Sequence, residues 1–418
     1  DPPEDPPADR DAADEPDAPP PPPATCEPLP PPEGDIVSVT ADRASELSSI
    51  VAAAGDGTTI RLETGTYALN GDTLVFNTPG VTLRSASNNP GDVTLDGNYG
   101  YGWSGDIMQI SASRVTIAHV TIKRAYEHPV HIMGGPGGDI EGILLHNIHV
   151  IDPGQQGIKV NRSYEHTYVD RGRIECSLIE LTDEGRPHVR DNCYTGGIDA
   201  HGAWGWEIRL NTIRGFWCPS GLSEHAIHFW QSSRDTLVER NLIVNCARAI
   251  GFGMYDYLEG MRAYDPNPYP DAAYLGHYDG IIRNNMIFAD DTVTTYDSGI
   301  NLHQTRGASA ICNTIVTTMT PFNSIEWRWP DTDVYIADNL VSHNIMDRGG
   351  SATLEGNIED APLSLFEVPA DANLHLLPTA ASAIDAGVSL AAGLCDEDFD
   401  GQSRDANPDV GADEFIEE

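Results

Sequence analysis

Two short stretches of the sequence carry imidazole and carboxylate groups at the same spacing. The stretches "EHPVH", residues 127–131, and "EHAIH", residues 224–228, each place a Glu-His pair shortly before a second His. These groups suit proton transfer and metal binding, because imidazole changes its charge near neutral pH and ligates transition metals. Whether the two stretches form one site or only repeat depends on the elements that carry them.

The chain is strongly acidic, which restricts its partners. Its 418 residues include 64 Asp and Glu against 24 Lys and Arg, giving a formal net charge of −40, and the two lysines are Lys123 and Lys159. Nucleic acid and anionic membranes bind basic surfaces, so we expect neither as a partner. An acidic polysaccharide would need a local cationic patch or bound divalent cations. No apolar run is long enough for a transmembrane segment.

Residues 1–34 are rich in Pro, Asp and Ala and contain too little apolar surface to pack. We expect a disordered, semi-rigid linker there. Such linkers hold exported domains away from a cell surface, and the chain has the character of a processed product. We therefore expect a monomer that is extracellular or on the outer cell surface, where the linker is available as a tether to the envelope.

The seven cysteines show neither a CxxC pair nor zinc-finger spacing. In an exported protein one or two disulfides are expected, and Cys193–Cys218 and Cys26–Cys395 are the pairings we suggest. Buried free thiols are the alternative.

A short phrase of the form apolar-x-x-Asn-x-apolar recurs through the chain, mostly in steps of 26 to 34 residues. Its Asn positions are 147, 211, 241, 285, 313, 339 and 357, with Ser177 and His119 filling the slot in two further copies. A second phrase with period-two alternation, such as "GIKVN" and "GIDAH", precedes each Asn phrase. This pattern predicts an all-β fold, a right-handed single-stranded parallel β-helix, with the Asn side chains in an internal ladder. We expect the β-helix over residues 35–380, with an N-terminal cap at 38–70, a Tyr-rich loop at 254–280 and a C-terminal cap at 381–418.

Two segments resemble the pectate-lyase-like superfamily. The segment "TADRASELSSIVAAAGDGTTIRLETGTYAL" resembles the capping helix and first coil of these β-helix proteins. Near the other end, "CDEDFDGQSRDANPDVGADEF" is similar to the Asp-Gly-x-x-Arg…Asp-x-Gly-Ala-x-Glu motif of secreted bacterial members. The resemblance implies the fold over about residues 35–418. The superfamily includes lyases, hydrolases, epimerases, adhesins and metal-handling proteins, so the resemblance does not select one activity.

Aligning the second phrase places side chains in two outward columns, with successive rungs about 4.8 Å apart. The first column contains Gln109, His131, Lys159, Asp199, His228, Gly251, Asn301 and Glu326. The second contains Ser111, Met133, Asn161, His201, Trp230, Gly253, His303 and Arg328. We expect this polar face to be the floor of a groove, with a gap at the two glycines where a ligand approaches the backbone.

The favoured hypothesis is a polysaccharide lyase, or a related epimerase, acting on an acidic polysaccharide by β-elimination. Proton abstraction next to a uronate carboxyl needs a base, an acid and a cation. On this hypothesis His228 or Lys159 is the base, His201 or a loop Tyr is the acid, and Arg162 or Arg234, with or without Ca²⁺, neutralises the carboxylate. The residues expected to contact substrate are Trp230, His131, Asn301, His303, Arg234, Tyr255 and Tyr257.

Three other functions remain open. Asp199 and Glu224 would be the paired carboxylates of a glycoside hydrolase. A copper- or zinc-binding surface protein would use His131, His201, His225, His228 and His303, together with His128. A carbohydrate-binding adhesin would use the Tyr-rich loop alone. Separately, Asp396, Asp398 and Asp400 have the alternate spacing of a small calcium loop, for which a capping role is the alternative.

Overall fold

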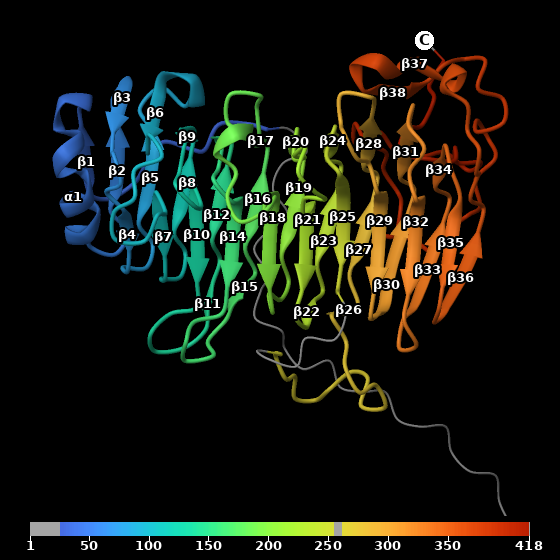
Figure 1. The fold of residues 1–418 in the computed structure, drawn as a ribbon, viewed down its shortest axis with the longest axis horizontal. Helices are drawn as coiled ribbons and strands as arrows, with labels where there is room; N and C mark the ends of the chain where they lie inside the picture. The colour runs from blue at the N-terminus through green and yellow to red at the C-terminus, as the bar shows by residue number, and fades with distance from the viewer. Residues whose placement is uncertain (1–25, 255–260, 418) are drawn as a thin grey trace, which may run out of the picture.

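The computed structural model describes residues 26–254 and 261–417. Within these ranges the chain winds into a right-handed parallel β-helix, and three parallel sheets run along its length (Figure 1). The one α-helix of the described residues, α1 (Leu47–Ala53), lies at the N-terminal end of the solenoid and buries Leu47 and Val51. The predicted fold class and capping helix are confirmed. No helix in the described ranges has the length and apolar character that a membrane span requires.

A complete coil contributes one strand to each sheet. Sheet A contains β1 (Ile36–Val39), β2 (Thr59–Leu62), β5 (Thr82–Ser85), β8 (Thr116–Ala118), β12 (Leu144–His146), β16 (Arg173–Glu175), β19 (Glu207–Arg209), β23 (Leu237–Glu239), β27 (Ile281–Arg283), β30 (Thr305–Ile311), β33 (Asp333–Ala337) and β36 (Ser351–Glu355), with β22 (Ser233–Arg234) and β26 (His277–Tyr278) attached through β30. Sheet B contains β3 (Gly65–Ala68), β6 (Val93–Asp96), β9 (Thr121–Lys123), β13 (His149–Ile151), β17 (Leu178–Glu180), β20 (Thr212–Arg214), β24 (Leu242–Val244), β28 (Met286–Ala289), β31 (Thr314–Thr317) and β34 (Leu340–Val341). The terminal strands β1 and β36 belong to sheet A alone.

Sheet C carries the predicted polar face. It contains β4 (Leu74–Phe76), β7 (Met108–Ile110), β10 (Val130–Met133), β14 (Gln156–Asn161), β18 (Gly196–His201), β21 (His225–Trp230), β25 (Arg248–Phe252), β29 (Ser298–His303), β32 (Asn323–Arg328) and β35 (Ile345–Arg348). Two short pairs lie outside these sheets, β11 (Ile140–Glu141) with β15 (Val169–Asp170) and the antiparallel β37 (Phe366–Val368) with β38 (Asn373–Leu376).

The core is a stack of apolar rungs. In sheet C, the inward positions are filled by Ile158, Ile198, Ile227, Ile250, Ile300 and Ile325, all fully buried. Val160, Phe229, Phe252 and Leu302 fill the next inward position and are equally buried. Because side chains alternate along a strand, this inward stack fixes the intervening side chains on the outer face.

An asparagine ladder lies at the turn between sheets A and B. The amide nitrogen of each side chain donates to the carbonyl oxygen of the next, at 2.8 to 3.0 Å, through Asn211, Asn241, Asn285, Asn313, Asn339 and Asn357. Each of the six also donates to a backbone carbonyl of the preceding coil, such as Asn241 to Ile208. The ladder therefore satisfies buried backbone groups of the turn as well as its own amides.

The ladder prediction was wrong for Asn147 and His119. Ser177 Oγ accepts from the backbone N–H of Ile148, so Ile148 occupies the ladder position in that coil. Asn147 and His119 lie one residue earlier, where the backbone is left-handed, with φ of 48° and 57°. Asparagine tolerates this conformation, so the same residue type occurs at both positions of the turn and misaligns the repeat.

Three disulfides tie the solenoid together: Cys26–Cys176, Cys193–Cys218 and Cys312–Cys395. The suggested Cys193–Cys218 pair is confirmed, and Cys26–Cys395 is wrong. Cys246 is a buried free thiol. Since Cys26 is bonded to Cys176, the segment 26–34, which was assigned to the linker, is attached to the β-helix, and residues 1–25 of the linker lie outside the described residues.

The C-terminal segment packs against the side of the solenoid. Its apolar side chains, including Phe366, Leu374 and Val410, contact Met286 and Phe288 on the outer face of sheet B. Figure 1 shows β37 and β38 beside the last strands of this sheet. Residues of the predicted cap 381–418, such as Val410 and Ala412, belong to this lateral layer, and so do residues 366–376, which were predicted to be part of the β-helix.

Asn241→Ala should lower the free energy of unfolding by about 3 kcal/mol, because it leaves the bonding partners of a fully buried amide unsatisfied. Urea denaturation measures this loss. The exposed Asn407→Ala is the matched control and should unfold at the wild-type urea concentration. Equal midpoints for the two variants would show that the ladder does not stabilise the fold.

Candidate functional site

The register of sheet C brings the predicted first column together. Cα partners run from Gln109 to His131, Lys159, Asp199, His228, Gly251, Asn301 and Glu326 without a slip. In the second column, His201 pairs with Trp230 and His303 pairs with Arg328. Side chains that are far apart in sequence are therefore immediate neighbours on one face.

The first column is buried, in contrast to the predicted open groove floor. Lys159, Asp199, His228, Asn301 and Glu326 are each between 2% and 4% exposed. Neighbouring rungs, the second column and residues of the connecting loops cover them. Polar groups this deeply buried require partners, and the column is divided into hydrogen-bonded clusters.

Lys159 forms the centre of one cluster. Its ammonium group contacts Asp199 Oδ2 and lies 3.0 Å from His201 Nε2 and 3.1 Å from the Tyr194 hydroxyl. Burial disfavours the charged ammonium, but the Asp199 carboxylate and Tyr194 outweigh it and raise the pKa of Lys159. Lys159 is therefore a cation with its three N–H donors engaged, which does not support its predicted role as the base.

Asp199 is the counter-ion of this cluster. Burial opposes its ionisation, yet Lys159 and then His201 hold the pKa of Asp199 well below its usual range. Its second oxygen accepts a hydrogen bond from Trp230 Nε1 at 2.7 Å. An ionised carboxylate suits the base or nucleophile of a glycoside hydrolase and not its general acid, but Asp199 is only 3% exposed and its oxygens are bonded to Lys159 and Trp230.

His201, Trp230 and Tyr194 form the accessible rim of the cluster, since each is only partly buried. Burial first, and then the Lys159 charge, lowers the pKa of His201, so its imidazole is neutral. Burial raises the pKa of Tyr194, which keeps its phenol protonated. The rim therefore presents a neutral imidazole and a phenol above a buried ammonium.

His228 lies beneath this rim. Its Nε2 donates to the Gly253 carbonyl at 3.0 Å, and the Trp230 ring stacks on it with centroids 5.4 Å apart. Burial lowers the pKa of His228, but the ring is enclosed between Trp230 and the Gly253 carbonyl and only 2% exposed. The structure therefore does not support His228 as the base.

The predicted gap at Gly251 is filled by His225. A Cβ atom on Gly251 would lie 2.8 Å from His225 Nε2, which bonds to Asn301 Oδ1 at 2.9 Å. Asn301 also accepts from Ser298 Oγ. The glycine thus accommodates a buried imidazole, and Asn301 is a packing partner with no free face for a ligand. Glu224 lies beside His225 and His228 at the entry to β21.

Glu326 forms a second cluster further along the column. It binds His303 Nε2 at 2.5 Å and Arg348 Nη1 at 2.8 Å, and Asn323 donates to it at 2.6 Å. Burial opposes its ionisation, but His303 and Arg348 lower the pKa of Glu326 to about 2. His303 is thus engaged in an ion-paired network and is only 15% exposed.

The predicted arginines do not gather at the Lys159 cluster. Arg162 follows β14 and donates to the ring of His166. Arg234 belongs to β22 in sheet A, where it pairs with Asp235 and faces Tyr264 and Trp204. Tyr255 and Tyr257 lie outside the described residues.

The terminal aspartates point to different partners. Asp398 is fully buried and accepts from three backbone N–H groups, and Asp396 accepts from Gly393. Asp400 binds His375 at 2.9 Å. These contacts hold the C-terminal segment together, as a capping role requires. Calcium binding by the three residues together stays a prediction.

Sequence reasoning missed two residues of this face. Tyr194 is in the insertion 185–196, which has no recognisable motif, and reaches Lys159 from the loop before β18. Asp106 precedes β7 and lies between His128 and His131. Asp106 could have been noticed from the sequence, because it is a carboxylate two positions before a short apolar strand. Nothing in the sequence of residues 185–196 indicated that Tyr194 would reach Lys159.

Comparison with known proteins identifies the fold. No protein family and no curated protein matches the sequence. Among solved structures, pectate lyase Pel9A is similar over 92% of this chain and 97% of its own, with 13% identity and a TM-score of 0.54. An alginate lyase from Paenibacillus sp. str. FPU-7 covers 77% of this chain and 99% of its own, with 15% identity and a TM-score of 0.51. The GH136 lacto-N-biosidase from Eubacterium ramulus covers 78% and 68%, with 11% identity and a TM-score of 0.54.

The chain is a parallel β-helix protein. At these identities the similarity shows a shared fold alone.

Asp199→Asn should lower the free energy of unfolding at neutral pH by about 3 to 5 kcal/mol, because it leaves the Lys159 ammonium buried without its counter-ion. The double variant Lys159→Met/Asp199→Asn removes both charges and keeps an acceptor for Trp230, so it should recover at least half of the loss. Urea denaturation of the three proteins measures the coupling. A single variant as stable as wild type would contradict the ion pair.

The depressed pKa of Glu326 predicts how stability depends on pH. The folded-state pKa of Glu326, about 2, lies below the ordinary value of 4.5. Its contribution to the free energy of unfolding is therefore fully present above pH 4.5 and is lost as the pH falls toward 2. Wild type should exceed Glu326→Gln by about 3 kcal/mol near neutral pH, and the gap should close in acid. Urea unfolding between pH 2 and neutral pH measures this gap. The exposed Glu165→Gln is the control and should unfold as wild type does. A gap that is independent of pH would contradict the assignment.

Proposed function

We propose that this chain is an exported carbohydrate-active protein that cleaves an acidic polysaccharide by β-elimination on the outer face of sheet C. The observation that carries the proposal is the contact of one ammonium group, Lys159, with both the His201 imidazole and the Tyr194 hydroxyl. A base, an acid and a cation are the three groups that this reaction needs.

Each group has a distinct role in the proposed reaction. The uronate carboxylate takes the place of His201 as an acceptor for Lys159, which leaves His201 Nε2 beside Asp199 Oδ2 at 3.2 Å and no longer bonded to the ammonium. This neutral imidazole then removes the proton next to the carboxyl group. As the carbon–oxygen bond to the leaving sugar breaks and the double bond forms, Tyr194 donates its proton to the departing oxygen, while Lys159 stabilises the negative charge that develops.

Two further observations support the proposal. Two of the solved structures with the same fold are, by their titles, a pectate lyase and an alginate lyase. The three disulfides belong to an oxidising compartment, which fits an extracellular or surface location where such polysaccharides occur.

The test is a screen of alginate, polygalacturonate and glycosaminoglycans, with and without Ca²⁺, for the ultraviolet absorbance of an unsaturated product. Tyr194→Phe removes one hydroxyl and should lower kcat on any substrate found by about 100-fold or more. His201→Gln should have a similar effect, because glutamine cannot take the proton. Tyr164→Phe, at a fully exposed tyrosine, is the matched control and should retain wild-type kcat.

The contrary outcomes are equally clear. Turnover that survives Tyr194→Phe and His201→Gln unchanged would place the reaction elsewhere. Saturable polysaccharide binding without an unsaturated product would instead indicate a binding protein.

A further inference from the structure

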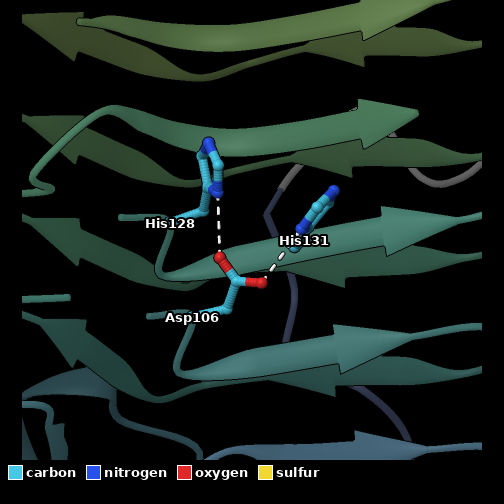
Figure 2. Close-up of side chains that lie close together, drawn as sticks. All are labelled: Asp106, His128 and His131. Atoms are coloured by element: carbon cyan, nitrogen blue, oxygen red, sulfur yellow. Dashed lines mark hydrogen bonds and ion pairs between the residues drawn. The ribbon is translucent and has the colours of Figure 1, made fainter. Parts of the chain in front are cut away.

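Asp106, His128 and His131 converge on the outer face near the N-terminal end of sheet C. Asp106 lies just before β7, and the two histidines belong to the next coil, before and within β10. The carboxylate lies between the two rings, with Oδ1 2.9 Å from His128 Nδ1 and Oδ2 3.0 Å from His131 Nδ1 (Figure 2). Each of the three residues offers one atom that could bind a metal, and these three atoms lie within 4.8 Å of one another.

Gln156 orients one of these rings. Its side-chain oxygen is 3.1 Å from His128 Nε2, and Gln156 is fully buried. The Gln156 amide can bond to either form of this nitrogen, since its oxygen accepts from N–H and its nitrogen donates to a lone pair. With its far nitrogen held by Gln156, the His128 ring directs Nδ1 toward the Asp106 carboxylate.

The protein's own contacts leave this cluster incomplete. His131 Nε2 and Gln156 Nε2 are buried without a hydrogen-bond partner. Gln109 Nε2 donates to Asp106 Oδ2 at 2.8 Å and so fixes the carboxylate orientation. Outer hydrogen bonds of this type, to a carboxylate and to the far nitrogen of a histidine, are typical of metal ligands.

We propose that Asp106, His128 and His131 bind a borderline divalent transition-metal ion of the Zn²⁺ or Cu²⁺ type. Imidazole nitrogen and carboxylate oxygen are the ligands these ions take at about 2.0–2.2 Å, which places the ligand atoms about 3 Å apart. Three protein ligands leave a coordination position for water or an exogenous ligand. The strongly acidic chain raises the local concentration of cations.

The related group Glu224, His225 and His228 is less suited to this role. His131 has 14% of its side chain exposed, which gives an ion a route to the Asp106 cluster. His228 is 2% exposed, and Trp230 stacks on it. The metal site is independent of the proposed lyase reaction, since none of its ligands belongs to the Lys159 cluster.

The test uses the full chain, purified without a His tag and stripped with a chelator. Zn²⁺ titration followed by elemental analysis of the gel-filtered protein should give a single ion per chain. Asp106→Asn, which keeps the side-chain shape, and His131→Ala should each weaken binding by about 100-fold or more, because loss of an outer-shell partner alone costs 10–100-fold. His166→Ala, at an exposed histidine, is the control and should bind as wild type does.

Cu²⁺ gives a second readout that does not depend on affinity. The paramagnetic resonance spectrum of the copper-loaded protein should show coupling to two nitrogens, and to one in His131→Ala. Matching thermal melts of the metal-free proteins show that the variants are folded.

Two results would overturn the proposal. One is wild-type protein that retains neither ion after gel filtration. The other is an ion that stays bound in Asp106→Asn but is lost in His225→Ala, which would assign it to the other group.

Discussion

The parallel register of sheet C is the constraint on which the rest of the structure depends. Each strand pairs with the next coil at about 4.8 Å, so a side chain has its neighbours in the coils before and after it. The inward rungs of Ile and Phe fix which positions face out. A slip of one residue would exchange the two sets, and every polar cluster of the outer face would be lost.

The same register makes a buried polar column possible. Charged groups at adjacent rungs are too close to remain unpaired, and burial makes each unpaired charge costly. The column solves this problem locally: Lys159 is paired with Asp199, and Glu326 with Arg348 and His303. Both of these clusters combine a buried charge, its partner and one partly accessible group, through which a ligand would reach the buried charge. In the proposed reaction, the partly accessible His201 is therefore the base and the buried Lys159 is the cation.

The period-two and Asn phrases were sufficient to predict the β-helix, its inward rungs and the order of both outward columns. They could not predict burial, because covering groups such as Tyr194 come from a loop with no repeat to align it. The rings of His225 and His228 illustrate the same limit: the sequence places both on this face, but their partners Asn301 and Gly253 follow from side-chain direction in three dimensions. The "EHPVH" and "EHAIH" stretches occupy equivalent places in two coils, and their surroundings differ because Asp106 precedes one of them and Gly251 follows the other.

The central claim is that Lys159 is a permanent cation that supports the rim of the site. The chain has two lysines, Lys123 and Lys159, so lysine-selective isotope labelling gives two side-chain signals that can be followed by nuclear magnetic resonance. The claim predicts that the Lys159 signal keeps the chemical shift of a charged ammonium beyond the ordinary lysine pKa of about 10.4. A Lys159 signal that loses its proton near neutral pH would contradict the account and would identify Lys159 as a base.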